Sequence, residues 1–164
     1  MPEVRGGVFE VCLFKHASEG TRYLLLQRSP SEKLYPLLWQ VITGTLHEGE
    51  HAVTGALREI REETSLAVEE FWVVPHVNVL YVARHDALLL SPFFAASVRP
   101  ESEPVLSAEH RDYRWTSIEE ALSLIPWPGQ RAGVELVHRF IASDPEGAPR
   151  SRLSGRDLEE RRPS

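Results

Sequence analysis

Three glutamates near the middle of the chain have the spacing of a binding site for a divalent cation. Glu59, Glu62 and Glu63 stand at i, i+3 and i+4, so on a helix their carboxylates lie within one turn of each other. Like charges this close repel unless water disperses them or a cation neutralises them. Mg²⁺ prefers oxygen ligands and is usually shared between carboxylates and substrate phosphates. The cluster indicates Mg²⁺ and a polyphosphate substrate, or alternatively the solvated face of an ordinary helix.

The residues before this cluster favour the metal-site interpretation. The stretch reads GTLHEGEHAVTGALREIREETSL, and its first residue, Gly44, follows an apolar run where a glycine lets the backbone turn tightly. Glu50 and Arg58 can form a bidentate ion pair, because a planar guanidinium holds two carboxylate oxygens. Apolar residues at helical spacing predict a helix from about His51 to Thr64. The helix would carry the glutamates and the ion pair would fix the loop that precedes it.

This stretch resembles the Nudix box, the sequence signature of the Nudix hydrolases. The family pattern is a glycine, five residues, a glutamate, seven residues, then Arg-Glu-aliphatic-any-Glu-Glu, any residue, a glycine and an aliphatic residue. The late glycine is the one departure, because Ser65 stands where the family closes the helix in a left-handed turn. The resemblance implies an enzyme that hydrolyses phosphoanhydride bonds of nucleoside diphosphates linked to another group.

The resemblance also implies which residues hold the metal. The expected ligands of Mg²⁺, or of Mn²⁺ as a substitute, are the Gly44 carbonyl, Glu59, Glu62, Glu63 and Glu109. Glu109 matches an acidic residue that completes the metal site in one branch of the family, and its alternative is an ordinary loop glutamate. The catalytic carboxylates are expected among Glu62, Glu63 and Glu109. Glu63 and Glu109 are both candidates for the base that removes the proton of the attacking water, and the sequence leaves that choice open.

Segments outside the box resemble the branch that contains the dihydroneopterin triphosphate pyrophosphatases and related nucleoside triphosphate pyrophosphohydrolases. They are LLLQRS from Leu24, LWQVITG from Leu38, SAEHRDYRW from Ser107 and WPGQR from Trp127. Arg28 matches a phosphate-contacting arginine of that branch, although arginines are also common at strand ends. Thr43, Trp39 and Arg5 are further candidates for contact with the substrate. The alternative interpretation of Thr43 is an ordinary strand threonine. The alternative interpretation of Trp39 is a core aromatic residue.

The expected reaction is metal-assisted attack of water on a nucleoside or pterin triphosphate, which gives a monophosphate and pyrophosphate. Dinucleoside polyphosphates and nucleotide sugars are alternative substrates for the same box. The alternative to an enzyme is a Nudix-fold module that binds a nucleotide without cleaving it. Such modules commonly lose acidic box residues, whereas Glu59, Glu62 and Glu63 are all present.

Composition limits the class of protein and its partners. The chain has 164 residues, of which 42% are hydrophobic, and this suits one domain with an ordinary core. A net charge of −6 argues against a nucleic-acid polymer as partner. A single cysteine, Cys12, suits a reducing compartment, and no apolar run approaches the roughly 20 residues that span a bilayer. We expect a cytoplasmic protein without a membrane partner, as a monomer or homodimer, with a small-molecule polyphosphate as its substrate.

The elements that position the box are predicted from apolar runs and turn residues. Strands are expected at Val8–Phe14, Tyr23–Gln27, Leu37–Thr43, Glu70–Ala83, Ala87–Val98 and Asp112–Thr116. Ser117 has the capping-box spacing of a helix start, and a last helix is expected over Gln130–Ile141. The resemblance implies the α/β class and the Nudix fold, an α/β/α sandwich with a mixed central sheet, over residues 1–142. We expect residues 143–164 to form a polar tail that is flexible or weakly helical.

Overall fold

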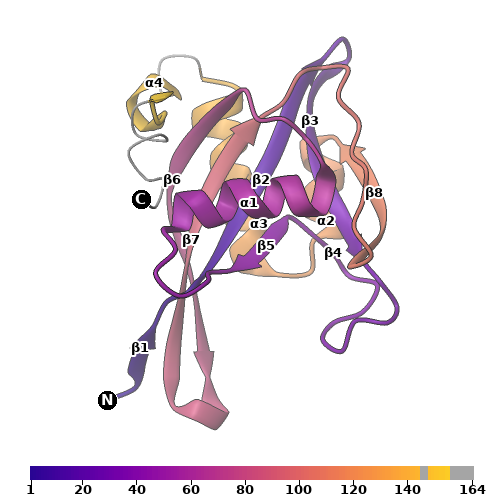
Figure 1. Cartoon of the computed structure of the whole chain (residues 1–164). Coiled ribbons are helices and arrows are strands. Elements are labelled where there is room, and N and C mark those ends of the chain that lie inside the picture. The colour runs from indigo at the N-terminus through magenta and orange to yellow at the C-terminus, as the bar shows by residue number, and fades with distance from the viewer. Residues whose placement is uncertain (145–147, 156–164) are drawn as a thin grey trace.

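A mixed sheet of eight strands forms the middle layer of the computed structural model, which describes residues 1–144 and 148–155. Helix α1 (Ala52–Thr64) crosses one face, and helices α2 (Ile118–Leu124) and α3 (Pro128–Val137) cover the other (Figure 1). The strands are β1 (Glu3–Arg5), β2 (Val8–Ala17), β3 (Gly20–Arg28), β4 (Trp39–Gln40), β5 (Ile42–Thr45), β6 (Glu70–Val82), β7 (Ala87–Ser97) and β8 (His110–Thr116). The predicted α/β/α sandwich with a mixed sheet is confirmed.

Strand β2 is the centre of the sheet. On one edge it runs parallel to β7, with Glu10 opposite Phe93. On its other edge two antiparallel partners follow one another, β5 along the first half and β3 along the second. Strand β1 extends the sheet beside β7, β6 pairs with the far edge of β7, and β3 carries both β4 and β8. This arrangement brings the start of β2 beside β5 and the long β6–β7 hairpin.

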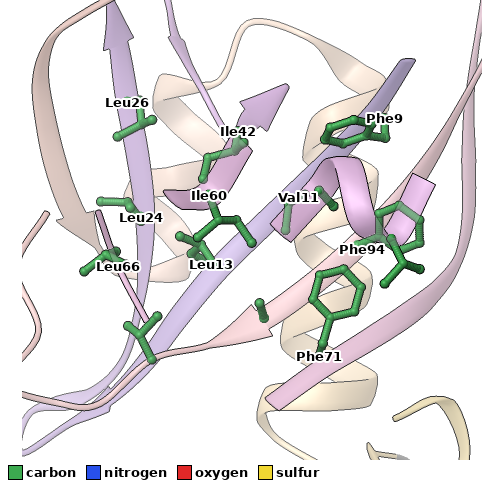
Figure 2. Packing of buried hydrophobic residues seen from close by; sticks show 14 residues of the cluster. Phe9, Val11, Leu13, Leu24, Leu26, Ile42, Ile60, Leu66, Phe71 and Phe94 are labelled. Atoms are coloured by element: carbon green, nitrogen blue, oxygen red, sulfur yellow. The ribbon is translucent and has the colours of Figure 1, made fainter. Parts of the chain in front are cut away.

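Helix α1 is held on the sheet by an apolar stripe. Val53, Ala56 and Ile60 are buried against Phe9 and further residues of β2, β3 and β7 (Figure 2). Fully burying a side chain such as Ile60 contributes about 1.5–3 kcal/mol to folding. This packing fixes which side of α1 faces the sheet, and thereby the directions in which the box glutamates project.

Helix α1 ends as its sequence predicts. Ser65 has a φ of 57°, in the left-handed region, and its N–H donates to the Arg61 carbonyl at 2.9 Å. A non-glycine residue adopts this conformation at a cost of roughly 1–2 kcal/mol. The serine therefore preserves the turn of the family's glycine at some expense of stability.

A second apolar cluster lies between the opposite face of the sheet and the helices α2 and α3. Its buried members include Cys12, Phe93, Val134 and Val137, so the predicted core position of the cysteine is confirmed. Ser117 caps α2 by accepting a hydrogen bond from the Glu120 N–H, as its capping-box spacing predicts. No helix in the described ranges is both long enough and apolar enough to cross a membrane.

Three elements differ from the sequence predictions. The single strand expected at Leu37–Thr43 is two short strands, because β4 pairs with β3 whereas β5 pairs with β2. Strand β1 was not predicted, because three exposed residues have no apolar pattern. The last helix ends as α-helix at Val137 and continues as a π-helical segment, His138–Ala142.

Part of the expected polar tail lies against the sheet. A short helix, α4 (Ala148–Ser151), precedes Arg152 and Leu153, which contact β6. The Leu153 N–H donates to the Phe71 carbonyl at 2.9 Å, and Arg152 pairs with Glu70 at 2.7 Å. Part of the segment after residue 142 therefore contacts the sheet of the domain. The flexibility predicted for residues 145–147 and 156–164 concerns residues outside the described ranges.

Candidate active site

A cavity of about 520 Å³ lies where β5 and α1 meet the start of β2 and the β6–β7 hairpin. One part of its wall carries most of the residues that the box and the branch resemblance single out: Arg28, Thr43, Gly44, Glu59, Glu63 and Glu109. The other part comes from the sheet: Val8, Phe9, Glu10, Asn78, Leu80, Leu89 and Ser91. Thr45 and His47, from β5 and the loop after it, complete the lining. The cavity thus joins an acidic end to a mixed apolar and polar end.

Glu63 is the most perturbed group of the acidic end. Its side chain is buried, with the residue 4% exposed, and burial raises its pKa to about 9, helped by the negative charges of Glu59 and Glu109. Within the described residues its Oε2 has no hydrogen-bond partner. A buried acceptor oxygen surrounded by like charges is the environment that a divalent cation stabilises.

His110 lies beside Glu63 and was not predicted as a site residue. Its Nδ1 is 3.9 Å from Glu63 Oε2, and within the described ranges neither ring nitrogen makes a hydrogen bond. Burial, and secondly the positive charge of Arg28, lowers the pKa of His110 to about 4. The imidazole is therefore neutral near pH 7 and does not neutralise the carboxylates.

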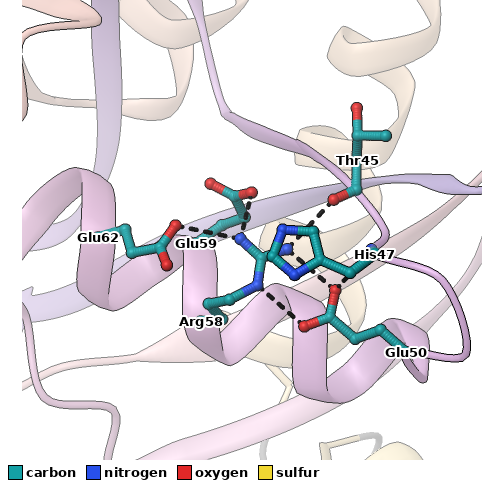
Figure 3. A network of polar contacts seen from close by, with 6 residues as sticks. All are labelled: Thr45, His47, Glu50, Arg58, Glu59 and Glu62. Carbon is teal, nitrogen blue, oxygen red and sulfur yellow. Dashed lines mark hydrogen bonds and ion pairs between the residues drawn. The ribbon is translucent and has the colours of Figure 1, made fainter.

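Arg58 organises the loop between β5 and α1 (Figure 3). Its Nε and Nη2 donate to the two oxygens of Glu50 at 2.9 and 3.0 Å, and Nη2 also donates to the Thr45 carbonyl at 3.1 Å. The hydrogen bonds from Arg58 lower the pKa of Glu50 to about 2. The predicted role of this pair in fixing the loop against the helix is confirmed by these contacts.

The same guanidinium holds two of the box glutamates. Arg58 Nη1 donates to Glu59 Oε1 at 2.7 Å and to Glu62 Oε2 at 3.1 Å (Figure 3). Among residues 1–144 and 148–155, no three acidic, histidine or cysteine side chains converge as they stand on a point that could hold a metal ion. Glu59 lines the cavity while its Oε1 accepts from Arg58, so that oxygen is already engaged.

The donor set of the cavity nevertheless suits a hard cation. Glu59, Glu63, Glu109 and the backbone of Gly44 are on its wall, and they offer only oxygen atoms. Oxygen ligands of this kind are those that Mg²⁺ and Mn²⁺ take in proteins. The buried Glu63 oxygen without a hydrogen bond is an acceptor that such an ion would satisfy. These residues therefore fit the predicted cofactor.

Gly44 is needed for space more than for a turn. It lies within β5, and its φ is not among the positive values that Gly7, Gly20 and Gly49 adopt. A Cβ atom built on it would lie 2.3 Å from the Phe9 ring and 2.6 Å from Glu59 Cγ. The tight turn inferred from the sequence is thus incorrect, and close packing against Phe9 and Glu59 is the reason for a glycine here.

Three predicted site residues are not on the cavity wall. Glu62 projects towards solvent, with its side chain 57% exposed, because α1 turns its buried stripe to the sheet and leaves this position outside. Trp39 packs at the edge of the second apolar cluster, 5.1 Å from the Arg114 guanidinium. Arg5 is exposed on β1 and pairs with Glu3 at 2.7 Å. These positions place the metal candidate Glu62 and the substrate candidates Trp39 and Arg5 outside the cavity wall, and their predicted roles stay predictions.

Arg28 reaches the cavity from the end of β3, as predicted, and part of its hydrogen-bonding capacity is already used. Its Nε donates to the Leu34 carbonyl at 2.9 Å and its Nη2 to Glu32 at 3.0 Å. Thr43 lines the same wall from β5. The Glu109 carbonyl accepts a hydrogen bond from the Ser29 N–H at 2.8 Å, which ties the loop before β8 to the end of β3.

The residues of the opposite wall were not predicted from the sequence. Glu10, Asn78 and Ser91 come from three strands that only the register of the sheet brings together. Burial raises the pKa of Glu10, and hydrogen bonds from Gln130 and Asn78 oppose that shift. One signal was available, since Glu10 is an acidic residue inside the otherwise apolar run VFEVCLF.

The family model of the NUDIX domain matches residues 8–155, so the chain belongs to the Nudix family. This confirms the family inferred from the box, and with it a hydrolase of the class that acts on phosphoanhydride bonds. The match also ends near Leu153, in agreement with the contact of this segment with β6.

Curated relatives include proteins of several names. The chain is 31% identical over 109 residues to a bis(5'-nucleosyl)-tetraphosphatase (asymmetrical) of Mus musculus, covering 65% of this chain and 74% of that protein. It is 30% identical over 122 residues to a dihydroneopterin triphosphate diphosphatase of Haemophilus influenzae, covering 66% and 73%. It is 32% identical over 126 residues to an octanoyltransferase of Myxococcus xanthus, covering 76% of this chain and 34% of that longer protein. The chain thus spans about a third of one such relative and about three quarters of the others.

Solved structures share the fold at lower identity. An Ap4A hydrolase binary complex of C. elegans has a TM-score of 0.68 at 20% identity, covering 84% of this chain and 98% of that one. The E. coli dihydroneopterin triphosphate pyrophosphohydrolase has a TM-score of 0.59 at 24% identity, covering 77% and 94%. At these identities the likeness shows the Nudix fold.

Proposed function

We propose that the protein is a Mg²⁺-dependent pyrophosphohydrolase that cleaves a nucleoside or pterin triphosphate into a monophosphate and pyrophosphate. The observation that carries this proposal is the acidic end of the cavity, where buried Glu63 lies with Glu59, Glu109 and Gly44 and faces Arg28. Carboxylates that need a cation, next to an arginine that can bind phosphate, suit a metal–polyphosphate complex. Mn²⁺ is the expected substitute metal.

Each residue has a distinct proposed role. Glu59, Glu63, Glu109 and the Gly44 carbonyl would hold the metal, which when bound neutralises phosphate oxygens and acidifies water. Arg28 would orient a phosphate by charge-assisted hydrogen bonds. Arg58 keeps Glu59 beside the cavity and fixes the loop through Glu50. Glu63 and Glu109 both remain candidates for the base that takes the proton of the attacking water.

The relatives support two substrate classes. The diphosphatase named for dihydroneopterin triphosphate agrees with the proposed triphosphate substrate. The tetraphosphatase named for bis(5'-nucleosyl) compounds supports a dinucleoside polyphosphate as the second candidate. Retention of every acidic residue of the box argues against a module that only binds nucleotides. A cytoplasmic location, and a monomeric or homodimeric state, belong to the same proposal.

Product identification by chromatography tests the proposal. A panel of dihydroneopterin triphosphate, nucleoside triphosphates, diadenosine polyphosphates and nucleotide sugars is incubated with Mg²⁺ or with EDTA. Mg²⁺-dependent release of pyrophosphate and a monophosphate is the expected result. Symmetric or asymmetric cleavage of a diadenosine compound alone would favour the second candidate. Saturable nucleotide binding without turnover of any compound would contradict hydrolysis.

A further inference from the structure

The sheet end of the cavity contains a carboxylate that the proposed hydrolysis does not use. Glu10 is 7% exposed, lines the cavity and lies on β2 next to Phe9. Neighbouring residues of a strand point to opposite faces, and Phe9 packs with Ile60 of α1, so Glu10 points to the face that α3 covers. It therefore lies apart from the carboxylates on α1, in the same cavity.

Two amides hold the Glu10 carboxylate in place. Gln130 Nε2 donates to Glu10 Oε1 at 3.2 Å, while Gln130 Oε1 accepts from the Val41 N–H at 3.4 Å, which fixes the orientation of this amide. Asn78 Nδ2 donates to both Glu10 oxygens at 3.3 and 3.4 Å. The hydrogen bonds from Gln130 and Asn78 are all received by Glu10, so its carboxylate acts as an acceptor.

The position of Asn78 depends on a glycine in α3. A Cβ atom built on Gly129 would lie 2.0 Å from Asn78 Oδ1, so any side chain there would displace the asparagine. His76 Nε2 lies 2.9 Å from the Gly129 carbonyl and links the same turn of α3 to β6. Neighbours on β6 and α3 thus hold the Glu10 carboxylate of β2 in position.

The surroundings of Glu10 suit a flat ring. Val8, Leu80 and Leu89 supply apolar surface on the same part of the cavity wall, and Asn78 and Ser91 supply polar atoms beside the carboxylate. Apolar walls with a few fixed polar groups are typical of sites for small organic ligands. An ionised carboxylate offers only acceptors on its two oxygens, so it pairs best with two neighbouring donors.

We propose that Glu10, Asn78 and Ser91 form a subsite for the ring of the substrate, and that it selects a ring N–H adjacent to an exocyclic amino group. Guanine and pterin rings both present this pair of donors. Adenine and cytosine present an amino group beside a ring acceptor, and uracil presents one N–H between two carbonyl groups. This inference rests on the proposed triphosphate substrate, because it assigns the organic half of that same molecule.

Binding of ligands that resist hydrolysis tests the subsite separately from catalysis. The α,β-methylene analogues of GTP, ITP and ATP are titrated calorimetrically into the full chain with Mg²⁺. ITP differs from GTP by loss of the exocyclic amino group. Because a hydrogen bond to a charged group is worth about tenfold or more in affinity, we expect the GTP analogue to bind at least about tenfold tighter than the others. Competition by guanosine and by dihydroneopterin then distinguishes the two ring classes.

Glu10→Gln is the matching variant, since it keeps the shape of the side chain and replaces one acceptor by a donor. It should reduce the preference for the GTP analogue over the ITP analogue to within about threefold. The control is Glu19→Gln, in the exposed turn between β2 and β3, which should keep the wild-type preference. Thermal unfolding checks that each variant folds. If Glu10→Gln does not fold, the relative affinities of the three analogues for the wild type still test the subsite.

The outcomes separate this inference from the proposed function. Equal affinity of the wild type for the three analogues, or a preference that survives in Glu10→Gln, would overturn the subsite and make the Glu10 network a structural feature. A clear preference that Glu10→Gln abolishes would support the subsite even if no triphosphate were hydrolysed. Hydrolysis without any preference among the rings would leave the proposed function standing and reject the subsite.

Discussion

At the scale of single residues, the site depends on a carboxylate that is unfavourable without a cation. Glu63 is buried among like charges, and its pKa is raised to about 9. Isolated burial of an ionised carboxylate is costly, whereas pairing with a metal offsets that cost. The buried Glu63 therefore lowers the stability of the metal-free protein and increases its affinity for a metal–phosphate complex.

Glu63→Gln should lower kcat by about 10²–10⁴-fold, because it removes a ligand or base from the acidic end of the cavity. The melting temperature in EDTA at pH 7 should not fall, because a pKa of about 9 leaves metal-free Glu63 protonated, and glutamine replaces one neutral group by another of the same shape. Steady-state kinetics and thermal unfolding measure the two effects. Glu48→Gln, at an exposed position of the preceding loop, is the control and should retain activity. Loss of activity that accompanies unfolding in EDTA would argue for a purely structural glutamate.

The pair of Glu50 and Arg58 predicts an acid dependence of stability. The pKa of Glu50 is lowered to about 2, below its unfolded value near 4.5, so the stabilisation is present above about pH 4.5. It is lost as the pH falls from there through about 2. The pair should contribute about 1–3 kcal/mol at pH 7, given its direct contacts and partial exposure.

Denaturant unfolding between pH 2 and 7 measures this contribution. Glu50→Gln should be less stable than the wild type at pH 7 by about that amount, and the difference should shrink toward pH 2. A difference that stays constant across this range would show that the effect of the substitution comes from packing and not from the charge on Glu50.

At the scale of elements, the sequence predicted local features better than partners in the sheet. The helix of the box, its left-handed end at Ser65 and the Ser117 cap follow from neighbouring residues, and the structure has all three. Division of Leu37–Thr43 into β4 and β5 depends on which distant strands are adjacent. Local pattern contains no information about those partners, so this division was not predictable.

The end of α1 offers a test of local strain. Ser65→Gly should stabilise the protein by about 0.5–1 kcal/mol. Glycine adopts the positive φ of 57° without steric cost, and the entropy that it adds to the unfolded chain offsets part of this gain. Chemical unfolding measures the difference. Ser102→Gly, at a position without a positive φ, should instead destabilise slightly. A destabilised Ser65→Gly variant would mean that the serine side chain contributes more than its backbone strain costs.

At the scale of the whole molecule, the candidate site was half predictable. The acidic end comes largely from one continuous stretch of sequence, and Gly44, Glu59 and Glu63 do line one cavity. The exposure of Glu62 depends on how far α1 is rotated on the sheet, which spacing alone did not resolve. The wall with Glu10 and Asn78 depends on strand register across more than sixty residues of sequence. Tertiary packing therefore decided the part that contacts the organic half of a substrate.

The contact of the C-terminal segment with β6 predicts a stability difference between two truncations. A chain that ends at Asp144 loses the Leu153–Phe71 hydrogen bond, the Arg152–Glu70 pair and the packing of Leu153. It should be less stable by about 1–3 kcal/mol. A chain that ends at Gly155 keeps these contacts and should be more stable than the chain that ends at Asp144 by this amount. Equal stability of both truncations in a thermal melt would show that this segment does not contribute.

The central claim is that the carboxylates of this cavity support metal-dependent cleavage of a triphosphate. The most direct measurement is the initial rate of pyrophosphate release from dihydroneopterin triphosphate and from GTP, for the wild type and Glu63→Gln, with Mg²⁺ and with EDTA. We expect release by the wild type with Mg²⁺, none with EDTA, and a rate about 10²–10⁴-fold lower for the variant. Equal rates for the wild type and Glu63→Gln, or undiminished release in EDTA, would contradict the claim.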